Sequence, residues 1–265
     1  MRRSRNRFLP IGLLLLLAAC ASDPAMQDGT MVNDPYEASN RRTHEFNKSL
    51  DNAVIGPVSR AFSGGSEKKR DGQGGGISGA VANVGANLSL PGKIVNHLLQ
   101  GRPGPAIRNG FRFAVNSTIG LGGVLDPAGA DFGLSEADTD FGETLAVWGV
   151  GEGAYLELPV LGPSTQRDAA GKVVDLVLDP LNHVLNDRQA FAAFGLRAAG
   201  KMADRARFGD TIDGVLQGSA DSYAQTRLIW LMHRRHELGE EGDAFDPYAT
   251  DDDAAIDPYD DPYAP

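Results

Sequence analysis

The chain has 265 residues, of which 42% are hydrophobic, and a formal net charge of −10 at pH 7. This hydrophobic content is enough for a sizeable folded core, while the acidic balance argues against a nucleic-acid partner and gives no general attraction to anionic membrane surfaces. The acidity belongs to the carboxyl-terminal end: without residues 1–19, which hold four Arg and no acid, the charge is −14, and eleven acids from Glu237 onward leave −3 for the remainder.

The first twenty residues predict a lipoprotein export signal. Four arginines precede an apolar run at residues 8–19 that is too short to span a bilayer comfortably, and Leu17, Ala18 and Ala19 come directly before Cys20. A bacterial lipobox has the cysteine that becomes the acylated amino terminus at this place, and an ordinary thiol is the alternative. Cys20 is the only cysteine, so its diacylglycerol and acyl (palmitate) modification is the one covalent group we expect, and no disulfide can form. We therefore predict a signal peptide at 1–19 and a lipidated flexible tether at 20–33.

The first folded segments are predicted to be helical. Phe46, Leu50 and Val54 recur every four residues, which predicts an amphipathic helix over residues 37–62, kinked or interrupted by Pro57. The glycine- and lysine-rich residues 63–76 predict a flexible exposed loop.

Two short helices, at 77–90 and 92–100, are then expected on either side of Pro91. A further helix at 105–119 is so apolar that it should be buried or face lipid. The glycine- and proline-rich residues 120–130 predict an adaptable hairpin or loop.

The later part of the chain is also mainly helical in pattern. Glycines at 149, 151 and 153 predict turns, and residues 155–161 are the strongest strand candidate. Ser164 or Thr165 should cap a helix that runs toward Leu178, and two long helices are expected at 188–207 and 219–238. These patterns predict an all-α class with glycine-rich loops and little or no sheet. Residues 34–238 form the predicted helical domain, and 239–265 an acidic disordered tail with repeated Asp-Pro-Tyr.

No enzyme signature or metal site emerges from the motifs. The chain lacks a Gly-x-Ser-x-Gly elbow, a Walker lysine and a dinucleotide-binding fingerprint in its required context. Only His233 and His236 share a helical face, where Arg234 and Arg235 would repel a cation. The carboxylates between Asp131 and Asp140 have no identifiable partner and are expected to be solubilising.

Several motifs in order resemble the MlaA/VacJ lipoprotein family. They are Asn-Val-Gly-Ala-Asn-Leu at 83–88, Asn-His-Leu-Leu-Gln-Gly at 96–101, Asn-Ser-Thr-Ile-Gly-Leu-Gly-Gly at 116–123, Asp-Pro-Ala-Gly at 126–129, Asp-Phe-Gly-Glu-Thr-Leu at 140–145, Trp-Gly-Val-Gly-Glu-Gly-Ala-Tyr at 148–155 and Leu-Gly-Pro-Ser-Thr-Gln-Arg-Asp at 161–168. Asn-Asp-Pro-Tyr-Glu at 33–37 and Asp-Ser-Tyr at 221–223 extend the match to about residues 33–238. The chain departs from the family pattern in its 63–76 segment, in Ser222 where Pro is expected, and in its acidic tail.

The resemblance implies a ring-like arrangement of short amphipathic helices around a central channel. It implies a lipoprotein on the periplasmic face of the outer membrane of a Gram-negative bacterium. Such a protein removes mislocalised phospholipids from the outer leaflet and passes them to a periplasmic lipid carrier, with trimeric porin as the usual membrane partner. This would be transport, not enzyme catalysis.

Candidate site residues follow partly from composition and mostly from the resemblance. A gate that swings on glycine is predicted in the loop at Gly120, Leu121, Gly122, Gly123, Val124 and Leu125. A rigid packing corner is the alternative for the same loop. Arg112, Arg167 and Asp168 are candidate channel-lining residues, with structural charge pairs as the alternative. Trp148 and Tyr155 lie at the membrane interface or in the core.

Two other functions remain open from the sequence. A scaffold lipoprotein would organise porins without touching lipid. An anchored periplasmic hydrolase, such as a phospholipase, would need a nucleophile and a base that the motifs do not identify.

Overall fold

The computed structural model describes residues 32–62 and 77–239. The predicted signal peptide, Cys20, nearly all of the tether, the loop at 63–76 and the tail from residue 240 lie outside the described residues. The described elements, in chain order, are α2 (Glu37–Leu50), the π-helix η1 (Asp51–Ile55), α3 (Gly56–Phe62), α4 (Ile77–Leu99), α5 (Pro103–Thr118), α6 (Pro127–Ala130), α7 (Phe141–Val147), β1 (Tyr155–Leu158), β2 (Gly162–Thr165), α8 (Gln166–Leu178), α9 (Leu181–Val184), α10 (Asp187–Arg207), α11 (Gly209–Gly218) and α12 (Ser222–Leu238).

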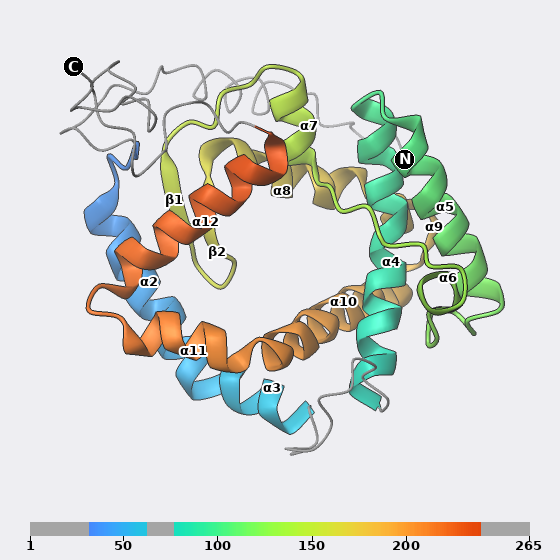
Figure 1. The fold of residues 1–265 in the computed structure, drawn as a ribbon, viewed down its shortest axis with the longest axis horizontal. Coiled ribbons are helices and arrows are strands. Elements are labelled where there is room, and N and C mark those ends of the chain that lie inside the picture. Colours follow the sequence, from blue (N-terminus) through green and yellow to red (C-terminus); the bar gives the residue numbers. More distant parts are fainter. Residues whose placement is uncertain (1–31, 63–76, 240–265) are drawn as a thin grey trace, which may run out of the picture.

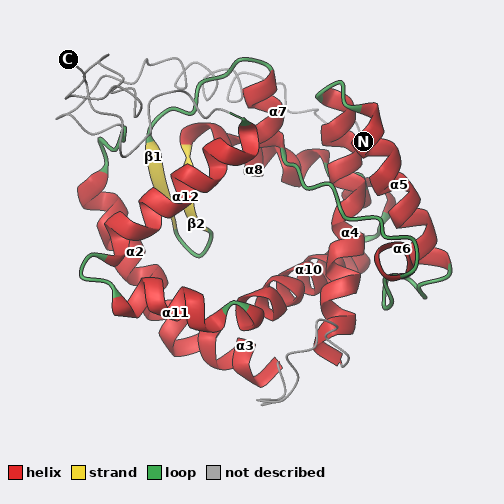
Figure 2. Cartoon of the chain, in the orientation of Figure 1, coloured by secondary structure: helices red, strands yellow, loops and turns green. Residues whose placement is uncertain are grey.

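The elements are arranged in a closed ring (Figure 1). The helix α4 packs between α5 and α10. The helix α10 also contacts α3 and α11, and α7 packs on α8. Helices make up nearly the whole ring, and β1 and β2 form one small antiparallel hairpin that pairs Tyr155 with Thr165 and Leu158 with Gly162 (Figure 2). The predicted mainly helical fold is thus confirmed.

The ring closes where the first and last described helices meet. Asn40 of α2 donates to the carbonyl of Tyr155 at 3.1 Å, and Arg41 pairs with Asp221 before α12. Tyr155, Tyr223 and Leu231 pack together as the buried hydrophobic cluster at this place. We call this contact of α2, β1 and the start of α12 the seam.

The predicted helix at 37–62 is confirmed, and its interruption lies just before Pro57. The amide of Gly56 bonds to the carbonyl of Asp51, five residues back, which is the spacing of a π-turn. Pro57 has no amide hydrogen for the carbonyl of Ala53, and its ring would clash with that carbonyl in a regular helix. The wider turn at Asp51–Ile55 removes this conflict without ending the helix.

The predicted break at Pro91 is wrong, because α4 runs without interruption from Ile77 to Leu99. Pro91 leaves the carbonyl of Asn87 without its usual helical donor, which normally favours a kink or an end. Packing along its length against α5 and α10 holds the two halves in one helix, and Leu90 beside the proline is almost fully buried.

The later helices agree with their local signals. Thr165 is the cap of α8, because its hydroxyl accepts the amide of Asp168 at 3.2 Å. The strand begins at Tyr155 as predicted and ends earlier, at Leu158. The sequence analysis did not identify the short elements α7, α9, α11 and β2, and the one-turn helix α6 lies inside the predicted loop at 120–130.

Asp221 provides a test of the seam, since its carboxylate accepts the amide of Ala224 at the start of α12 and also pairs with Arg41. We expect Asp221→Ala to lower the free energy of unfolding by about 1 kcal/mol at pH 7 through loss of the cap. Asp221→Asn keeps an acceptor and loses only an exposed ion pair, so its cost should be a few tenths of a kcal/mol. Urea unfolding of the detergent-solubilised variants measures both.

The ion pair also predicts a pH dependence. Hydrogen bonds from Arg41 lower the pKa of Asp221 from 3.8 to about 2. A lowered pKa in the folded state stabilises the fold above the unfolded value and loses this effect as the pH falls through the folded value. The difference between the wild type and Asp221→Asn should therefore be nearly full above pH 5, decrease as the pH falls toward about 2, and vanish only below that value. A difference that stays constant down to pH 2 would contradict this assignment.

Candidate functional site

The distribution of polar and apolar side chains is inverted relative to a water-soluble protein. Among the described residues, 21 polar or charged residues are buried, against 12 hydrophobic ones, while 28 large hydrophobic residues are exposed. Buried charged residues are normally rare, and extended exposed apolar surface marks a site of contact with protein or membrane. The outer surface of this ring is therefore suited to an apolar environment.

The helix α5 shows the inversion most clearly. Asn109, Arg112 and Asn116 are buried on one face, at helical spacing. Ile107 and Phe111 lie on the opposite face, with exposed fractions of 72% and 46%. The sequence left open whether this helix is buried or faces lipid, and the structure gives it a polar buried face and an apolar exposed face.

The exposed apolar side chains continue around the ring. Val173, Leu176 and Val177 form a stripe along one face of α8. Trp148 is exposed, and its indole donates to the carbonyl of Leu99 at 3.2 Å, whereas Tyr155 is fully buried and belongs to the core. Other exposed large hydrophobic residues are Phe46, Val54 and Val58 near the first helices, Val184, Phe191 and Phe194 on α9 and α10, and Leu228, Ile229 and Met232 on α12.

The turn after α5 contains the predicted gate residues. Leu121, Gly122 and Gly123 all have positive φ angles, of 55°, 74° and 92°, a region that glycine enters without steric cost. A Cβ atom on Gly123 would lie 2.7 Å from the Cβ of Asn87 on α4, whereas a Cβ on Gly122 would meet nothing within 4 Å. Leu121 and Leu125 project apolar side chains into the surroundings. The turn thus touches α4 closely at Gly123 and is free at Gly122.

A polar cluster fixes the far end of this turn to α5. Asp126 accepts hydrogen bonds from Arg112 at 3.1 Å and from Asn116 at 2.7 Å, and it caps α6 through the amide of Gly129. Burial opposes ionisation of Asp126, but these hydrogen bonds and the charge of Arg112 outweigh it and lower the pKa of the carboxyl. The turn is therefore fixed at Asp126 by a charged cluster. At Gly122, a Cβ atom would meet no other atom within 4 Å.

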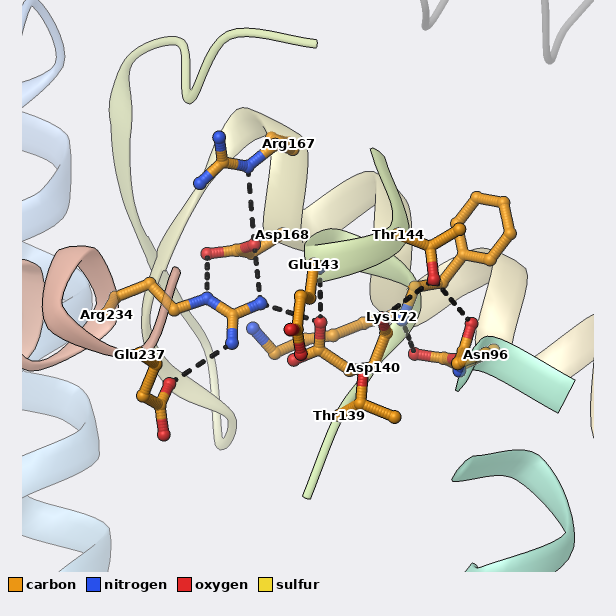
Figure 3. A network of polar contacts seen from close by, with 12 residues as sticks. Asn96, Thr139, Asp140, Glu143, Thr144, Arg167, Asp168, Lys172, Arg234 and Glu237 are labelled. Atoms are coloured by element: carbon orange, nitrogen blue, oxygen red, sulfur yellow. Dashed lines mark hydrogen bonds and ion pairs between the residues drawn. The ribbon is translucent and has the colours of Figure 1, made fainter. Parts of the chain in front are cut away.

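A second polar network joins α12 to α7 and α8 (Figure 3). The guanidinium of Arg234 bonds to Asp168 at 3.0 and 3.2 Å and to Asp140 at 2.6 Å. It also reaches Glu237 on its own helix at 3.3 Å. Arg167 lies on the other side of Asp168, with 3.8 Å between Nε and Oδ1. Asp168, whose side chain is 3% exposed, is thus held between two arginines.

The same network continues toward α4. Thr144 donates to Asn96 at 3.0 Å, and Asn96 donates to Asp175 at 2.8 Å. Asp175 also accepts the amide of Phe141, and burial raises the pKa of its carboxyl. Lys172 donates to Ser164 at 2.9 Å, and burial lowers the pKa of its amine. This chain of amide, hydroxyl and carboxylate groups couples four helices through the interior of the ring wall.

The predicted channel-lining residues lie in these two clusters. Arg112 is in the anchor of the turn, whereas Arg167 and Asp168 are in the network at α8, so the structure does not bring the three together. Their contacts are those of structural charge pairs, the alternative that the sequence left open. Contact with lipid headgroups stays a prediction.

Other members of the clusters were not identified from sequence. Asp138 and Glu136 pair with Lys93, Asp140 pairs with Arg234, and Arg235 pairs with Glu152. The expectation that these carboxylates are only solubilising is therefore wrong for Glu136, Asp138 and Asp140, because their partners lie on helices distant in sequence. Within the described part of the chain, no group of three His, Cys, Asp or Glu residues is arranged to hold a metal ion. None of the described helices is both long and apolar enough to cross a membrane.

The network around Asp168 makes a testable prediction. Arg234→Met would leave a buried carboxylate without its main partner, so we expect the free energy of unfolding to fall by about 3 kcal/mol. Glu237→Gln removes only the exposed contact of the same guanidinium and should cost less than about 0.5 kcal/mol. Chemical unfolding of both variants in detergent compares them, and equal small losses would show that Arg234 is not required to compensate Asp168.

Comparison with known proteins agrees with this architecture. The sequence profile of the MlaA lipoprotein family matches residues 32–237. The intermembrane phospholipid transport system lipoproteins MlaA of Escherichia coli (strain K12) and Shigella flexneri are each 32% identical over 244 residues, which is 91% of this chain and 91% of theirs. A solved structure described as the structural basis for maintenance of bacterial outer membrane lipid asymmetry is 28% identical, with a TM-score of 0.61, and covers 77% of this chain and 98% of its own.

These similarities extend over the whole ring and are not confined to one motif. The family profile begins at residue 32, shortly before α2, and ends at residue 237 in the last turn of α12. The chain belongs to the MlaA lipoprotein family.

Proposed function

We propose that this protein transports phospholipids and helps to maintain the lipid asymmetry of the outer membrane. The observation that carries the proposal is the inverted polarity of the ring, with many polar groups buried in its wall and many large apolar residues exposed. An apolar outer face can rest in lipid without a membrane-spanning segment, as interfacial helices do. The names of the relatives, which place them in an intermembrane phospholipid transport system, support the same function.

The proposed site of action is the periplasmic face of the outer membrane. The acylated Cys20 would anchor the chain, since each buried CH₂ of an acyl chain contributes roughly 0.8 kcal/mol and two or more chains give stable attachment. The ring then lies in the inner leaflet, with stripes such as Val173, Leu176 and Val177 against lipid tails. Mislocalised phospholipid from the outer leaflet passes through the ring to a periplasmic lipid carrier, and trimeric porin is the proposed membrane partner.

The turn at residues 119–125 is the proposed gate for this passage. Its anchor at Asp126 is charged and fixed, whereas a Cβ at Gly122 would meet no atom within 4 Å. A swing of the turn would rotate the backbone near Gly122 and break the hydrogen bonds from the amides of Gly122 and Gly123 to the end of α5. Leu121 and Leu125 can contact lipid tails before and after such a swing. Transport of this kind requires no covalent chemistry and no nucleotide.

The transport proposal is tested by lipid analysis and by localisation. Mature protein purified in detergent should carry phospholipid detectable by mass spectrometry, and cells that lack it should show excess surface-exposed phospholipid. Cys20→Ala should give a folded protein that is missing from the outer-membrane fraction. Porin bound without any phospholipid, together with a normal outer leaflet in the deletion, would favour the scaffold function instead.

The gate makes a separate prediction at Gly122. Gly122→Ala meets no neighbour within 4 Å, but φ +74° is a strained conformation for alanine, so the variant should disfavour the present shape of the turn. We expect higher surface-exposed phospholipid at an unchanged protein level. Gly101→Ala is the matched control, because Gly101 also has a positive φ, of 69°, meets nothing within 4 Å and lies outside the turn. Equal phospholipid levels in the two variants would mean that the turn is a rigid corner.

A further inference from the structure

The seam contains a serine, a histidine and a glutamate in one line of contacts. Ser222 Oγ lies 3.1 Å from Nε2 of His44, and Nδ1 of His44 lies 3.5 Å from Oε1 of Glu157. The three residues come from α12, α2 and β1, so the fold brings together side chains that are up to 178 positions apart. A nucleophile, a base and an orienting carboxylate in this order are the elements of nucleophilic acyl transfer.

The carboxylate of Glu157 is fixed by several donors. The hydroxyl of Tyr155 donates to Oε2 at 2.5 Å, and Asn47 donates to Oε1 at 3.2 Å. The backbone amide of Glu157 donates in turn to the side-chain oxygen of Asn40 at 3.0 Å. Both His44 and Glu157 have side chains that are only 2% exposed. A proton on Nδ1 of His44, facing this carboxylate, leaves Nε2 free to accept the hydroxyl hydrogen of Ser222.

Ser222 lines a pocket on its other side. The pocket has a volume of about 420 Å³ and is lined by Arg41, Glu45 and Lys48 of α2 and by residues 219–223 before and at the start of α12. The residue that contacts the buried base thus also lines a cavity large enough for part of a lipid headgroup and its ester. Arg41 and Lys48 are balanced in this lining by Glu45 and Asp221, and Arg41 is paired with Asp221, so the lining is polar and carries no net charge.

We propose that Ser222, His44 and Glu157 form an acyl-transfer site that hydrolyses carboxylic esters of amphiphiles, an activity beyond phospholipid transport. In the first step, Ser222 Oγ attacks the ester carbonyl carbon while its proton moves to Nε2 of His44. The tetrahedral intermediate collapses, the alcohol leaves with that proton, and an acyl group stays on Ser222. In the second step, water attacks the acyl carbonyl and gives a proton to His44. The acid is released when Ser222 Oγ leaves and takes that proton back from His44, which regenerates both residues. Glu157 stabilises the imidazolium formed in both steps.

A fluorophosphonate probe tests this site directly, because an activated serine displaces its fluoride and retains the phosphonyl group. Mature full-length protein in detergent should become labelled at Ser222, as located by peptide mass spectrometry. Loss of the base in His44→Gln should slow labelling by at least about 100-fold. Ser49→Ala is the matched control: Ser49 also lies on the seam helix α2, but its hydroxyl is bonded to the carbonyl of Glu45 and it does not line the pocket, so labelling should continue at the wild-type rate.

Turnover is measured with a para-nitrophenyl ester and with a diacyl glycerophospholipid in mixed micelles. Release of fatty acid from the phospholipid, abolished by Ser222→Ala, would identify membrane lipid as a source of the ester. Release from the small ester alone would limit the site to soluble esters. No labelling of Ser222 and no turnover of either ester would overturn the proposal, and so would labelling that is equally fast in His44→Gln.

A second variant separates catalysis from folding. Ser222→Cys keeps a nucleophile of similar size, and activation by His44 would make it react with iodoacetamide faster at pH 7 than a free thiol. Reaction at the rate of a free thiol would show that the contact with His44 only stabilises the seam. The hydrolase and the transporter are tested independently. If the two activities are separate, Ser222→Ala should leave the level of surface-exposed phospholipid unchanged. The transport proposal fails only on the lipid measurements described above.

Discussion

The pairing of buried polar groups is the constraint on which the rest of the structure depends. A ring wall with carboxylates and guanidiniums inside is stable only if each charge has a partner, because an unpaired buried charge costs several kcal/mol. Asp168 between Arg167 and Arg234, and Asp126 between Arg112 and Asn116, meet this requirement. Since the polar groups satisfy one another inside the wall, the apolar side chains are left to cover its outer surface.

The local part of this arrangement could be predicted from sequence. Apolar spacing predicted the helices that became α2, α5, α10 and α12. Ser164 or Thr165 was predicted as a cap because a hydroxyl before a helical run satisfies a free backbone amide, and the structure shows that Thr165 has this role. Pro57 was correctly predicted to interrupt its helix, because the loss of a helical hydrogen bond at a proline depends only on that helix. The family resemblance predicted the mainly helical class in addition, and sequence and structural similarity to MlaA proteins supports it.

The parts that failed depend on contacts between distant segments. Pro91 does not end α4 because α5 and α10 pack along both of its halves. Arg234 and Asp140 are 94 positions apart, so no local pattern shows that they meet, and exposed-looking carboxylates near Asp140 are in fact paired. The same limit applies to His44 and Ser222, which are 178 positions apart, because the Asp-Ser-Tyr motif at 221–223 does not indicate that the two side chains meet. The helix α5 did carry a usable signal in its sequence. Asn109, Arg112 and Asn116 recur at helical spacing, which predicts that these polar residues share one face of the helix.

The seam has a consequence for how the protein is made. The ring closes through contacts between α2, the first described helix, and α12, the last, so the closing contacts span almost the entire folded domain. Contacts of such long sequence separation form late and slowly. Until α12 has been made, the amino-terminal helices therefore lack this partner. Even a small truncation within α12 should remove the closing contacts and leave the ring open.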